Sequence, residues 1–160
     1  MDRFQEAGIP FTLTDHRTVG NALDVTFNGA LYDEQMRAAK AILEYDNGIL
    51  AATTSFGKTV VGAYMIAERK TNTLILVHNT EIQKNWIEDL NKFLDINAEL
   101  PEYKTKTGRV KKRKNIIGKL HAGHNSMTGI IDVAIFSSLG KGEEINPMLA
   151  QYGMVIMDEC

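Results

Sequence analysis

The sequence has almost no cysteine and no long hydrophobic run. Cys160 is the one cysteine among 160 residues, so no internal disulfide can form, and we expect a reducing, cytoplasmic location. No apolar run approaches the length that crosses a membrane, and the N-terminal residues, with Asp2 and Glu6, lack the hydrophobic segment of a secretory signal. These absences argue against a disulfide-stabilised secreted domain and against a membrane protein or a membrane partner.

Acidic residues are missing from one segment. Residues 104–114 hold seven of the 18 basic residues and no acidic one, which leaves 11 basic against 20 acidic residues elsewhere, a balance of −9. The segment also has no aromatic side chain that would stack on a base, so it offers only sequence-independent attraction for phosphate groups. Such a run is either a phosphate-binding surface or a mobile, solvated loop.

The hydrophobic pattern predicts one α/β domain. Hydrophobic residues make up 44% of the chain, enough for a single core without disulfides or metal, and there is no internal repeat. Their periodicity predicts an N-terminal β-hairpin with strands over 9–14 and 23–27, followed by alternating helices and strands. The expected helices are 31–45, 60–67, 80–94 and 147–152, and the expected strands are 48–52, 73–77, 130–136 and 154–157. This alternation favours a mainly parallel sheet with right-handed crossovers.

The segment Ala-Thr-Thr-Ser-Phe-Gly-Lys-Thr, residues 52–59, predicts a phosphate-binding loop between a strand and a helix. Gly57 has no Cβ and lets the backbone approach phosphate oxygens, Lys58 can reach the β and γ phosphates, and the Thr59 hydroxyl can bind Mg²⁺. The candidate nucleotide-binding residues of the loop are Thr54, Ser55, Phe56, Gly57, Lys58 and Thr59.

A second half of an ATP site follows the expected strand 154–157. Asp158 and Glu159 come at the carboxyl end of that strand, where ligands bind in open α/β sheets. We expect Asp158 to hold Mg²⁺ together with Thr59, and Glu159 to orient or deprotonate the attacking water, with Lys58 as the third catalytic residue. An Asp-Glu pair after an apolar run is otherwise a solvated strand end, but the phosphate loop upstream favours the ATP site.

Four segments in this order resemble motifs of the superfamily-two helicases. They are the phosphate loop (motif I), residues 76–80 ahead of Trp86 (motif Ia), residues 131–139 (motif Ic) and residues 155–160 (motif II, the start of a DECH box). The resemblance covers residues 22–160 and is strongest for the DEAD/DEAH-box ATPases of type I and type III restriction subunits and for bacterial relatives of the XPB repair helicase.

The resemblance implies a RecA-like P-loop NTPase fold, an α/β three-layer sandwich around a central, mainly parallel sheet. Residues 1–29 would be an N-terminal β extension, and residues 30–160 the first of two RecA-like domains, incomplete at motif II. It further implies ATP and Mg²⁺ as cofactors, DNA as the partner with RNA as the alternative, and contacts with a second RecA-like domain and further domains. The activity would be ATP hydrolysis coupled to unwinding or movement, and the isolated chain would be nearly inactive.

The resemblance also assigns further binding residues. Gln35, in a leucine–aromatic–glutamine signature, is the expected adenine reader, because its amide both donates and accepts hydrogen bonds; otherwise it is an exposed residue of a first helical turn. The expected nucleic-acid-binding residues follow two strands and are His78, Asn79, Thr80, Ser137 and Ser138. Helix capping explains Asn79 and Thr80 equally well, and strand termination explains the serines.

Other interpretations stay open. A phosphate-loop kinase would use the same loop, but the sequence has no Arg-rich lid segment. A nucleic-acid-binding or assembly module with a degenerate ATP site is supported by Ser55, which stands where helicase loops commonly have glycine, and by the end of the chain at motif II. His121 and His124 have the spacing of a metal-binding pair, but without nearby cysteine or further histidine they are better explained as loop residues.

Overall fold

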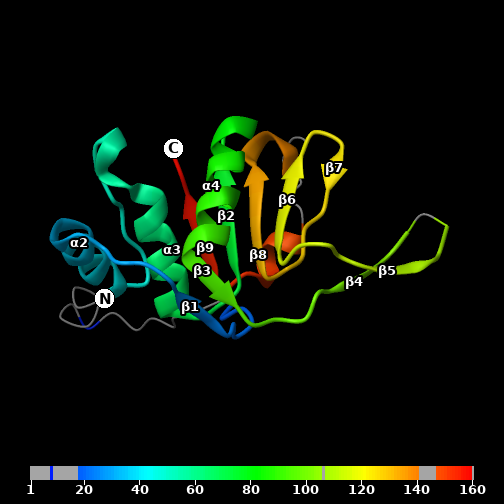
Figure 1. The fold of residues 1–160 in the computed structure, drawn as a ribbon, viewed down its shortest axis with the longest axis horizontal. Coiled ribbons are helices and arrows are strands. Elements are labelled where there is room, and N and C mark those ends of the chain that lie inside the picture. The colour runs from blue at the N-terminus through cyan, green and yellow to red at the C-terminus, as the bar shows by residue number, and fades with distance from the viewer. Residues whose placement is uncertain (1–7, 9–17, 106, 141–146, 160) are drawn as a thin grey trace.

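A mostly parallel sheet forms the centre of the fold in the computed structural model, which describes residues 8, 18–105, 107–140 and 147–159 (Figure 1). The five strands lie in the order β7-β6-β8-β2-β9. Their bounds are β2 Thr73–Val77, β6 Ile117–His121, β7 His124–Asn125, β8 Ile131–Ile135 and β9 Met154–Met157. All adjacent pairs are parallel except β6 and β7, which confirms the predicted α/β class with a mainly parallel sheet.

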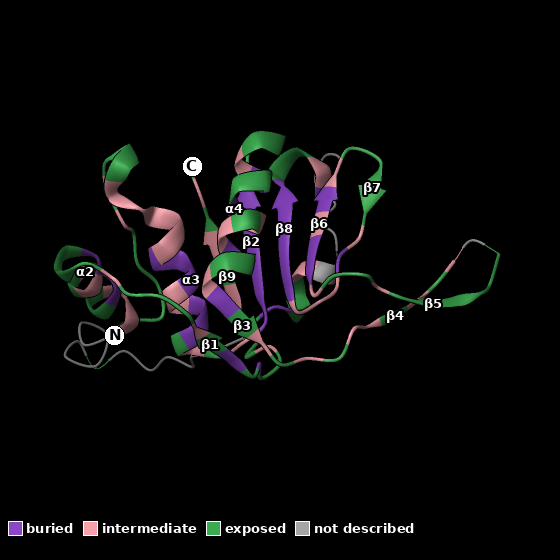
Figure 2. Ribbon diagram, in the orientation of Figure 1, coloured by how far each residue is buried: buried purple, intermediate pink, exposed green. Residues whose placement is uncertain are grey.

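The two central strands, β2 and β8, are buried at every position, as strands covered on both faces must be (Figure 2). Their register pairs Thr73 with Ile131 and Val77 with Ile135, and β9 pairs Leu76 with Met157. The carboxyl ends of β2, β8 and β9 therefore lie along one edge of the sheet.

Helices α3 Lys58–Arg69 and α4 Thr80–Phe93 pack on one face of this sheet, and α2 Asp33–Leu43 contacts α3 from outside. Ala63, Ile66, Trp86 and Leu90 of these helices are buried with the apolar residues of β2 and β8. α4, the longest described helix, has 14 residues, and none of the described helices is long and apolar enough to span a membrane.

The opposite face of the sheet is covered differently. In the described ranges, the side chains packed there come from loops and from the 3-10 segments η2 Phe136–Ser138 and η3 Pro147–Gln151, and they are Met127, Leu139, Leu149 and Tyr152. A layer of α-helices on this face, which a three-layer sandwich requires, is therefore not confirmed.

The predicted N-terminal hairpin is not confirmed, although a strand is present where its second strand was expected. Residues 9–14 lie outside the described residues, whereas β1 Val25–Phe27 lies within the expected strand 23–27. β1 pairs in antiparallel fashion with β3 Leu94–Ile96, which directly follows α4. The side chain of Phe27 stacks on Phe93 and meets Tyr64 edge-on, so aromatic packing joins β1 to both main helices.

The expected strand over 48–52 is wrong for this structure. These residues form no strand, and Ile49 is 94% exposed. An apolar run becomes a strand only when a neighbouring strand pairs with it, and in the described part of the chain the sheet ends at β9.

Apart from residue 106, which lies outside the described residues, most of the basic run belongs to a β-hairpin. β4 Glu102–Lys104 and β5 Val110–Lys112 pair in antiparallel fashion and project from the body beyond the β6–β7 side of the sheet (Figure 1). The guanidinium of Arg113 lies 4.3 Å from the centre of the Tyr103 ring, which braces the base of this arm.

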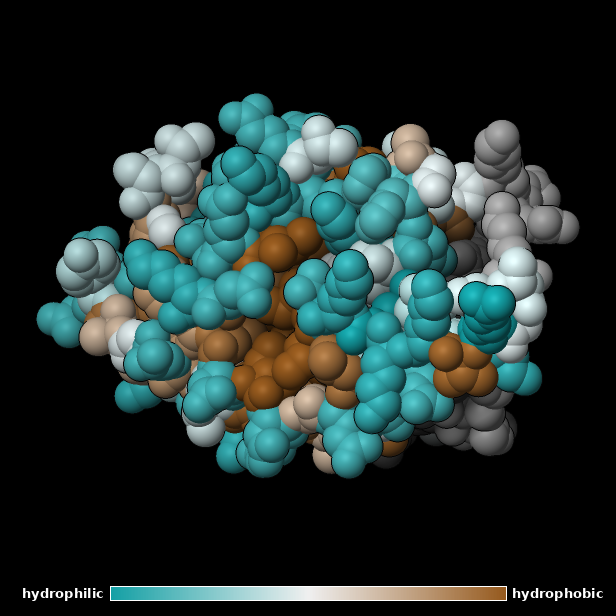
Figure 3. Space-filling view, turned by 45° about the vertical axis from the view of Figure 1, so that its right-hand side comes forward, coloured by the Kyte–Doolittle hydropathy of each residue, from teal (hydrophilic) through white to brown (hydrophobic). Residues whose placement is uncertain are grey.

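Apolar surface remains visible in the middle of the face shown in Figure 3, framed by hydrophilic side chains. Phe27, Ile82, Ile87, Phe93 and Ile96 are among the partly buried residues that pack against the main core.

Candidate ATP site and nucleic-acid interface

The predicted phosphate loop lies directly before α3. Residues Thr54–Phe56 form a 3-10 turn, and Gly57 has φ +82° and ψ +43°, the left-handed conformation in which a side chain is strained. A Cβ at Gly57 would also lie 2.6 Å from the Gln35 amide nitrogen. The helix then begins at Lys58, so the N–H groups of Lys58 and Thr59 have no acceptor within the helix and can bind an anion.

Gln35 is buried behind this loop, which excludes the exposed alternative. Its Nε2 donates to the carbonyl of Phe56 at 2.7 Å, and its Oε1 accepts from the N–H of Tyr32 at 2.9 Å. One amide hydrogen and one acceptor lone pair remain for other partners. The contacts show Gln35 tying α2 to the phosphate loop, while adenine reading stays a prediction.

Motif II extends the sheet by one residue. The N–H of Asp158 donates to the Leu76 carbonyl at 2.9 Å, and its Oδ2 accepts from the indole N–H of Trp86 at 2.7 Å. Trp86 was not among the expected site residues, because its place in the apolar spacing of α4 indicated only a core position. The one signal in the sequence was that a buried indole needs an acceptor for its N–H.

Glu159 has φ +57°, and its Oε2 lies 3.6 Å from Nδ1 of His78. Both side chains are about half exposed, at 48% and 52%. The structure thus brings together one expected catalytic residue and one expected nucleic-acid-binding residue. No described hydrogen bond or ion pair joins residues 54–59 directly to Asp158 or Glu159.

Gly62 provides the connection between α3 and motif II. A Cβ on Gly62 would lie 2.5 Å from Cη2 of Trp86 and 3.6 Å from Cδ1 of Ile156, so the helix backbone lies directly against both residues. Gly62 follows Lys58 by one helical turn and shares its face of α3. The loop helix, the indole and the end of β9 are therefore packed into one unit.

The donor set fits Mg²⁺ bound together with a triphosphate. Mg²⁺ takes hard oxygen ligands, usually one or two from the protein, with phosphate oxygens and water completing its shell. Thr59 offers a hydroxyl and Asp158 offers Oδ1, which has no hydrogen-bond partner among the described residues. Within the same ranges no three His, Cys, Asp or Glu side chains cluster, so a protein-enclosed metal centre is not indicated there.

The expected nucleic-acid residues divide between two places on the same sheet edge. Asn79 is the N-cap of α4, because its Oδ1 accepts from the N–H of Ile82 at 2.9 Å, so the capping alternative is confirmed for this residue. His78 and Thr80 flank it and are exposed.

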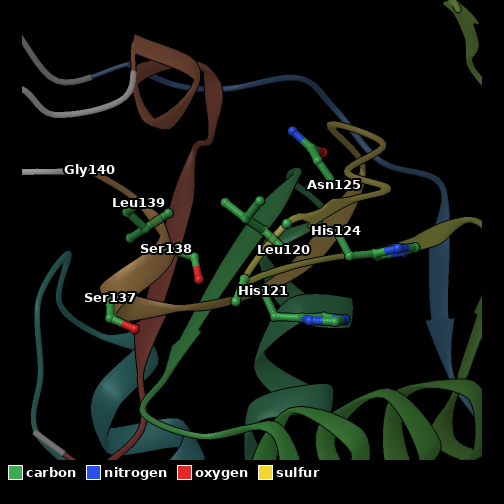
Figure 4. Close-up of a pocket in the computed structure, with 10 residues that line it drawn as sticks. Leu120, His121, His124, Asn125, Ser137, Ser138, Leu139 and Gly140 are labelled. Carbon is green, nitrogen blue, oxygen red and sulfur yellow. The ribbon is translucent and has the colours of Figure 1, made fainter.

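Ser137 and Ser138 follow β8 and line a shallow pocket of about 600 Å³ beside the turn that joins β6 to β7 (Figure 4). His121 and His124 lie on that turn with their rings stacked, 5.1 Å between centroids and 17° between planes. In Figure 4 both rings extend away from the serines. No third potential metal ligand joins them among the described residues, which fits the loop interpretation.

The clearest perturbed carboxyl lies away from this edge. Asp132, near the start of β8, is fully buried, and burial raises its pKa although hydrogen bonds from Tyr152, Thr128 and Gly129 oppose the shift. Burial, and then the charge of Asp132, raise the pKa of the Tyr152 hydroxyl, which donates to that carboxylate. This group holds η3 against the sheet and is structural.

Comparison with known proteins relates the chain to the same class of helicases that its motifs resemble. Residues 28–160 match the family described as type III restriction enzyme, res subunit. The chain is 30% identical over 129 residues to the DNA 3'-5' translocase XPB2 of Sulfurisphaera tokodaii, covering 81% of this chain and 24% of that protein. It is 25% identical over 167 aligned residues to the putative helicase 161L of Invertebrate iridescent virus 6, covering 97% of this chain and 35% of that protein.

The chain thus spans less than two thirds of the length of either relative. The matched family segment begins before the phosphate loop and includes motifs I, Ia, Ic and II in order. The chain belongs to the type III restriction enzyme res-subunit family, within helicase superfamily two.

Proposed function

We propose that this chain is the ATP-binding, first RecA-like domain of a DNA helicase or translocase of the restriction or repair type. The observation that carries the proposal is the left-handed Gly57 at the start of the 12-residue helix α3, packed through Gly62 and Trp86 onto the carboxylate of Asp158. A phosphate cradle and a Mg²⁺-binding carboxylate on one packed unit are what triphosphate hydrolysis requires.

In this proposal the residues of the loop bind the nucleotide. The N–H groups at the start of α3 and the Lys58 ammonium hold the β and γ phosphates, and Thr59 and Asp158 hold Mg²⁺. Mg²⁺ held by these two residues would neutralise charge on the phosphates. Glu159 orients a water molecule for in-line attack and accepts its proton. The distance of 3.6 Å between the Glu159 carboxylate and His78 supports a coupling of hydrolysis to nucleic-acid binding in this proposal.

Nucleic acid would lie along the edge formed by the ends of β2 and β8. His78, Thr80, Ser137 and Ser138 are at least partly exposed there and would contact backbone phosphates. Such contacts position a strand without reading sequence, as movement along DNA requires. The second RecA-like domain would supply the arginine finger, so the isolated chain should hydrolyse ATP slowly.

The second candidate function is a nucleic-acid-binding or assembly module with a degenerate ATP site. It is favoured by residues 48–52, which form no strand ahead of the phosphate loop, and by Ser55 in the loop itself. The two candidates differ in whether nucleotide binds.

Binding of Mg·ATP and Mg·ADP, measured by calorimetry, tests the proposal. We expect weak but saturable binding that Lys58→Ala lowers by at least about tenfold, since a charge-assisted contact to phosphate is lost. Lys40→Ala is the matched control, because it removes the same charge at an exposed position of α2, and this variant should bind nucleotide as the wild type does. Equal affinity in the wild type and the Lys58 variant would contradict the ATP site and favour the degenerate module.

A further inference from the structure

Trp86 makes a contact that its place in the core does not require. It is the one tryptophan of the chain, it is 2% exposed, and its indole N–H donates to Oδ2 of Asp158 at 2.7 Å. An indole has a single polar hydrogen, so this bond uses its whole donor capacity. The acceptor is the one carboxylate that the ATP site assigns to Mg²⁺.

The position of the indole is set by the packing around it. Gly62 leaves no room for a side chain, because a Cβ there would lie 2.5 Å from Cη2 and 3.0 Å from Cζ3 of Trp86. Buried residues of both helices, Ile66 and Leu90 among them, belong to the same core cluster. The ring therefore has little freedom to turn, and the direction of its N–H is fixed before any ligand binds.

We propose that Trp86 is a positioning residue that holds the Asp158 carboxylate ready for Mg²⁺, and this inference rests on the proposed ATP site. The bond restrains the carboxylate through Oδ2 and leaves Oδ1 without a described partner, available to the ion or to its water. Hydrogen bonds from residues that contact a metal ligand but not the metal itself orient that ligand. Their loss typically weakens metal affinity or activity by 10- to 100-fold.

The packing of Gly62 on Trp86 also links the phosphate loop to Asp158. α3 carries Lys58 and Thr59 at its start, and Gly62 of that helix lies against the indole that holds Asp158. A shift of α3 on phosphate binding would move the indole and with it the carboxylate. Trp86 thus connects the phosphate loop to motif II.

The first experiment compares Mg²⁺ affinity at saturating ATP in the full chain, by calorimetry. Trp86→Phe keeps an aromatic ring and removes the N–H, and we expect its Mg²⁺ affinity to fall at least about tenfold, with a smaller change in affinity for metal-free ATP. Ile131→Val, which trims the same core at the start of β8 without touching the hydrogen bond, is the control and should keep wild-type Mg²⁺ affinity while lowering the melting temperature.

A purely structural role gives a different pattern. Trp86→Phe would then resemble Ile131→Val, with a lower melting temperature and unchanged Mg²⁺ affinity, and this result would overturn the positioning role. If wild-type protein binds ATP and Mg²⁺ but the variant binds both equally well, only this inference fails. If the wild type binds no nucleotide, the proposed function fails and this inference with it.

The second experiment keeps Trp86 and uses it as the probe, so it does not depend on how the substituted protein folds. Mn²⁺ is paramagnetic and suits the same oxygen ligands as Mg²⁺, and we expect it to quench Trp86 emission in the presence of ATP. Asp158→Asn retains an acceptor for the indole but loses the charge that binds metal, and it should abolish the quenching. Quenching that persists in Asp158→Asn at the same Mn²⁺ concentration would contradict the proposal.

Discussion

The buried amide of Gln35 contacts both the start of its own helix and the phosphate loop. Its bond to the Phe56 carbonyl lies one residue before Gly57, and its nitrogen occupies the space that a side chain at Gly57 would need. At the scale of single residues, the loop conformation therefore depends on a glutamine that lies 21 positions earlier in the chain. The resemblance assigned this glutamine to adenine, whereas its described contacts stabilise the loop.

Substitution of Gln35 separates these two functions. If Gln35 only supports the loop, Gln35→Ala should lower the affinities for ATP and for inorganic tripolyphosphate by the same factor, about three- to tenfold. The reason is that both ligands bind the same loop. If Gln35 reads the base, the loss should appear with ATP alone. Competition binding against a fluorescent nucleotide measures both affinities.

Gln35→Glu is the matched control for the loop contact. Glutamate keeps the acceptor for the Tyr32 N–H but has no hydrogen to donate to the Phe56 carbonyl. We expect Gln35→Glu to lower the affinity for tripolyphosphate as Gln35→Ala does. Undiminished tripolyphosphate affinity in both variants would show that the loop does not depend on Gln35.

Among the elements, α4 and the residue just before its N-cap contact both carboxylates of motif II. Trp86, in its second turn, donates to Asp158, and His78, just before its N-cap, lies 3.6 Å from Glu159. The helix start is also the place proposed for nucleic acid. A ligand at this end of α4 would therefore lie close to the two residues that we propose for hydrolysis.

Asn79 tests whether the start of α4 meets nucleic acid or only caps the helix. Asn79→Ala should lower the free energy of unfolding by about 1 kcal/mol, because the cap on the Ile82 N–H is lost. Asn79→Asp caps equally well and should keep that stability, but it adds a negative charge that repels a DNA phosphate. Urea unfolding and fluorescence anisotropy with single-stranded DNA measure the two effects.

The two Asn79 variants distinguish a phosphate contact from helix capping alone. Weaker DNA binding by Asn79→Asp at unchanged stability would place a phosphate near the cap. Wild-type affinity in that variant would restrict Asn79 to capping and leave the strand-end serines as the candidate contacts.

The elements that sequence predicted well are those whose pattern follows from local physics. The strand at 73–77 is apolar after Thr73, and the run 130–136 is interrupted only by Asp132. The helix after Asn79 has apolar spacing and a capping residue, so burial and capping suffice to locate these elements. β6 was missed because Gly118 and Lys119 interrupt its apolar run. Gly118 is explained only by tertiary structure, since a Cβ there would collide with the Asp132 carboxylate.

The site residues also divide into those that local sequence predicts and those that only tertiary structure explains. The roles proposed for Lys58, Thr59, Asp158 and Glu159 rest on residue type and order, and the last two residues follow β9 at the expected edge of the sheet. The Trp86 bond was not predictable, because it joins residues 72 positions apart through a register that no local pattern specifies.

At the scale of the whole molecule, positive charge is concentrated on one projecting arm. The run 104–114 carries seven cations, and the rest of the chain has 11 basic and 20 acidic residues. Most of the run belongs to the β4–β5 hairpin, which extends away from the sheet (Figure 1). Arg113 has a structural part in this arm, because it stacks on Tyr103 and donates to the Asn125 carbonyl at 3.3 Å.

The exposed lysines of the arm can be removed without disturbing that stacking. If Lys111, Lys112 and Lys114 contact DNA, replacing all three with Gln should weaken binding to every sequence alike and reduce the slope of log affinity against log salt concentration by about two to three. The physical reason is that each cation that neutralises a phosphate releases a condensed counterion. Replacing Arg37, Lys40 and Lys84 with Gln changes net charge equally at exposed positions outside the arm and should leave the slope almost unchanged. Fluorescence anisotropy over a salt series gives both slopes, and equal slopes in the wild type and the arm variant would assign these lysines to solvent.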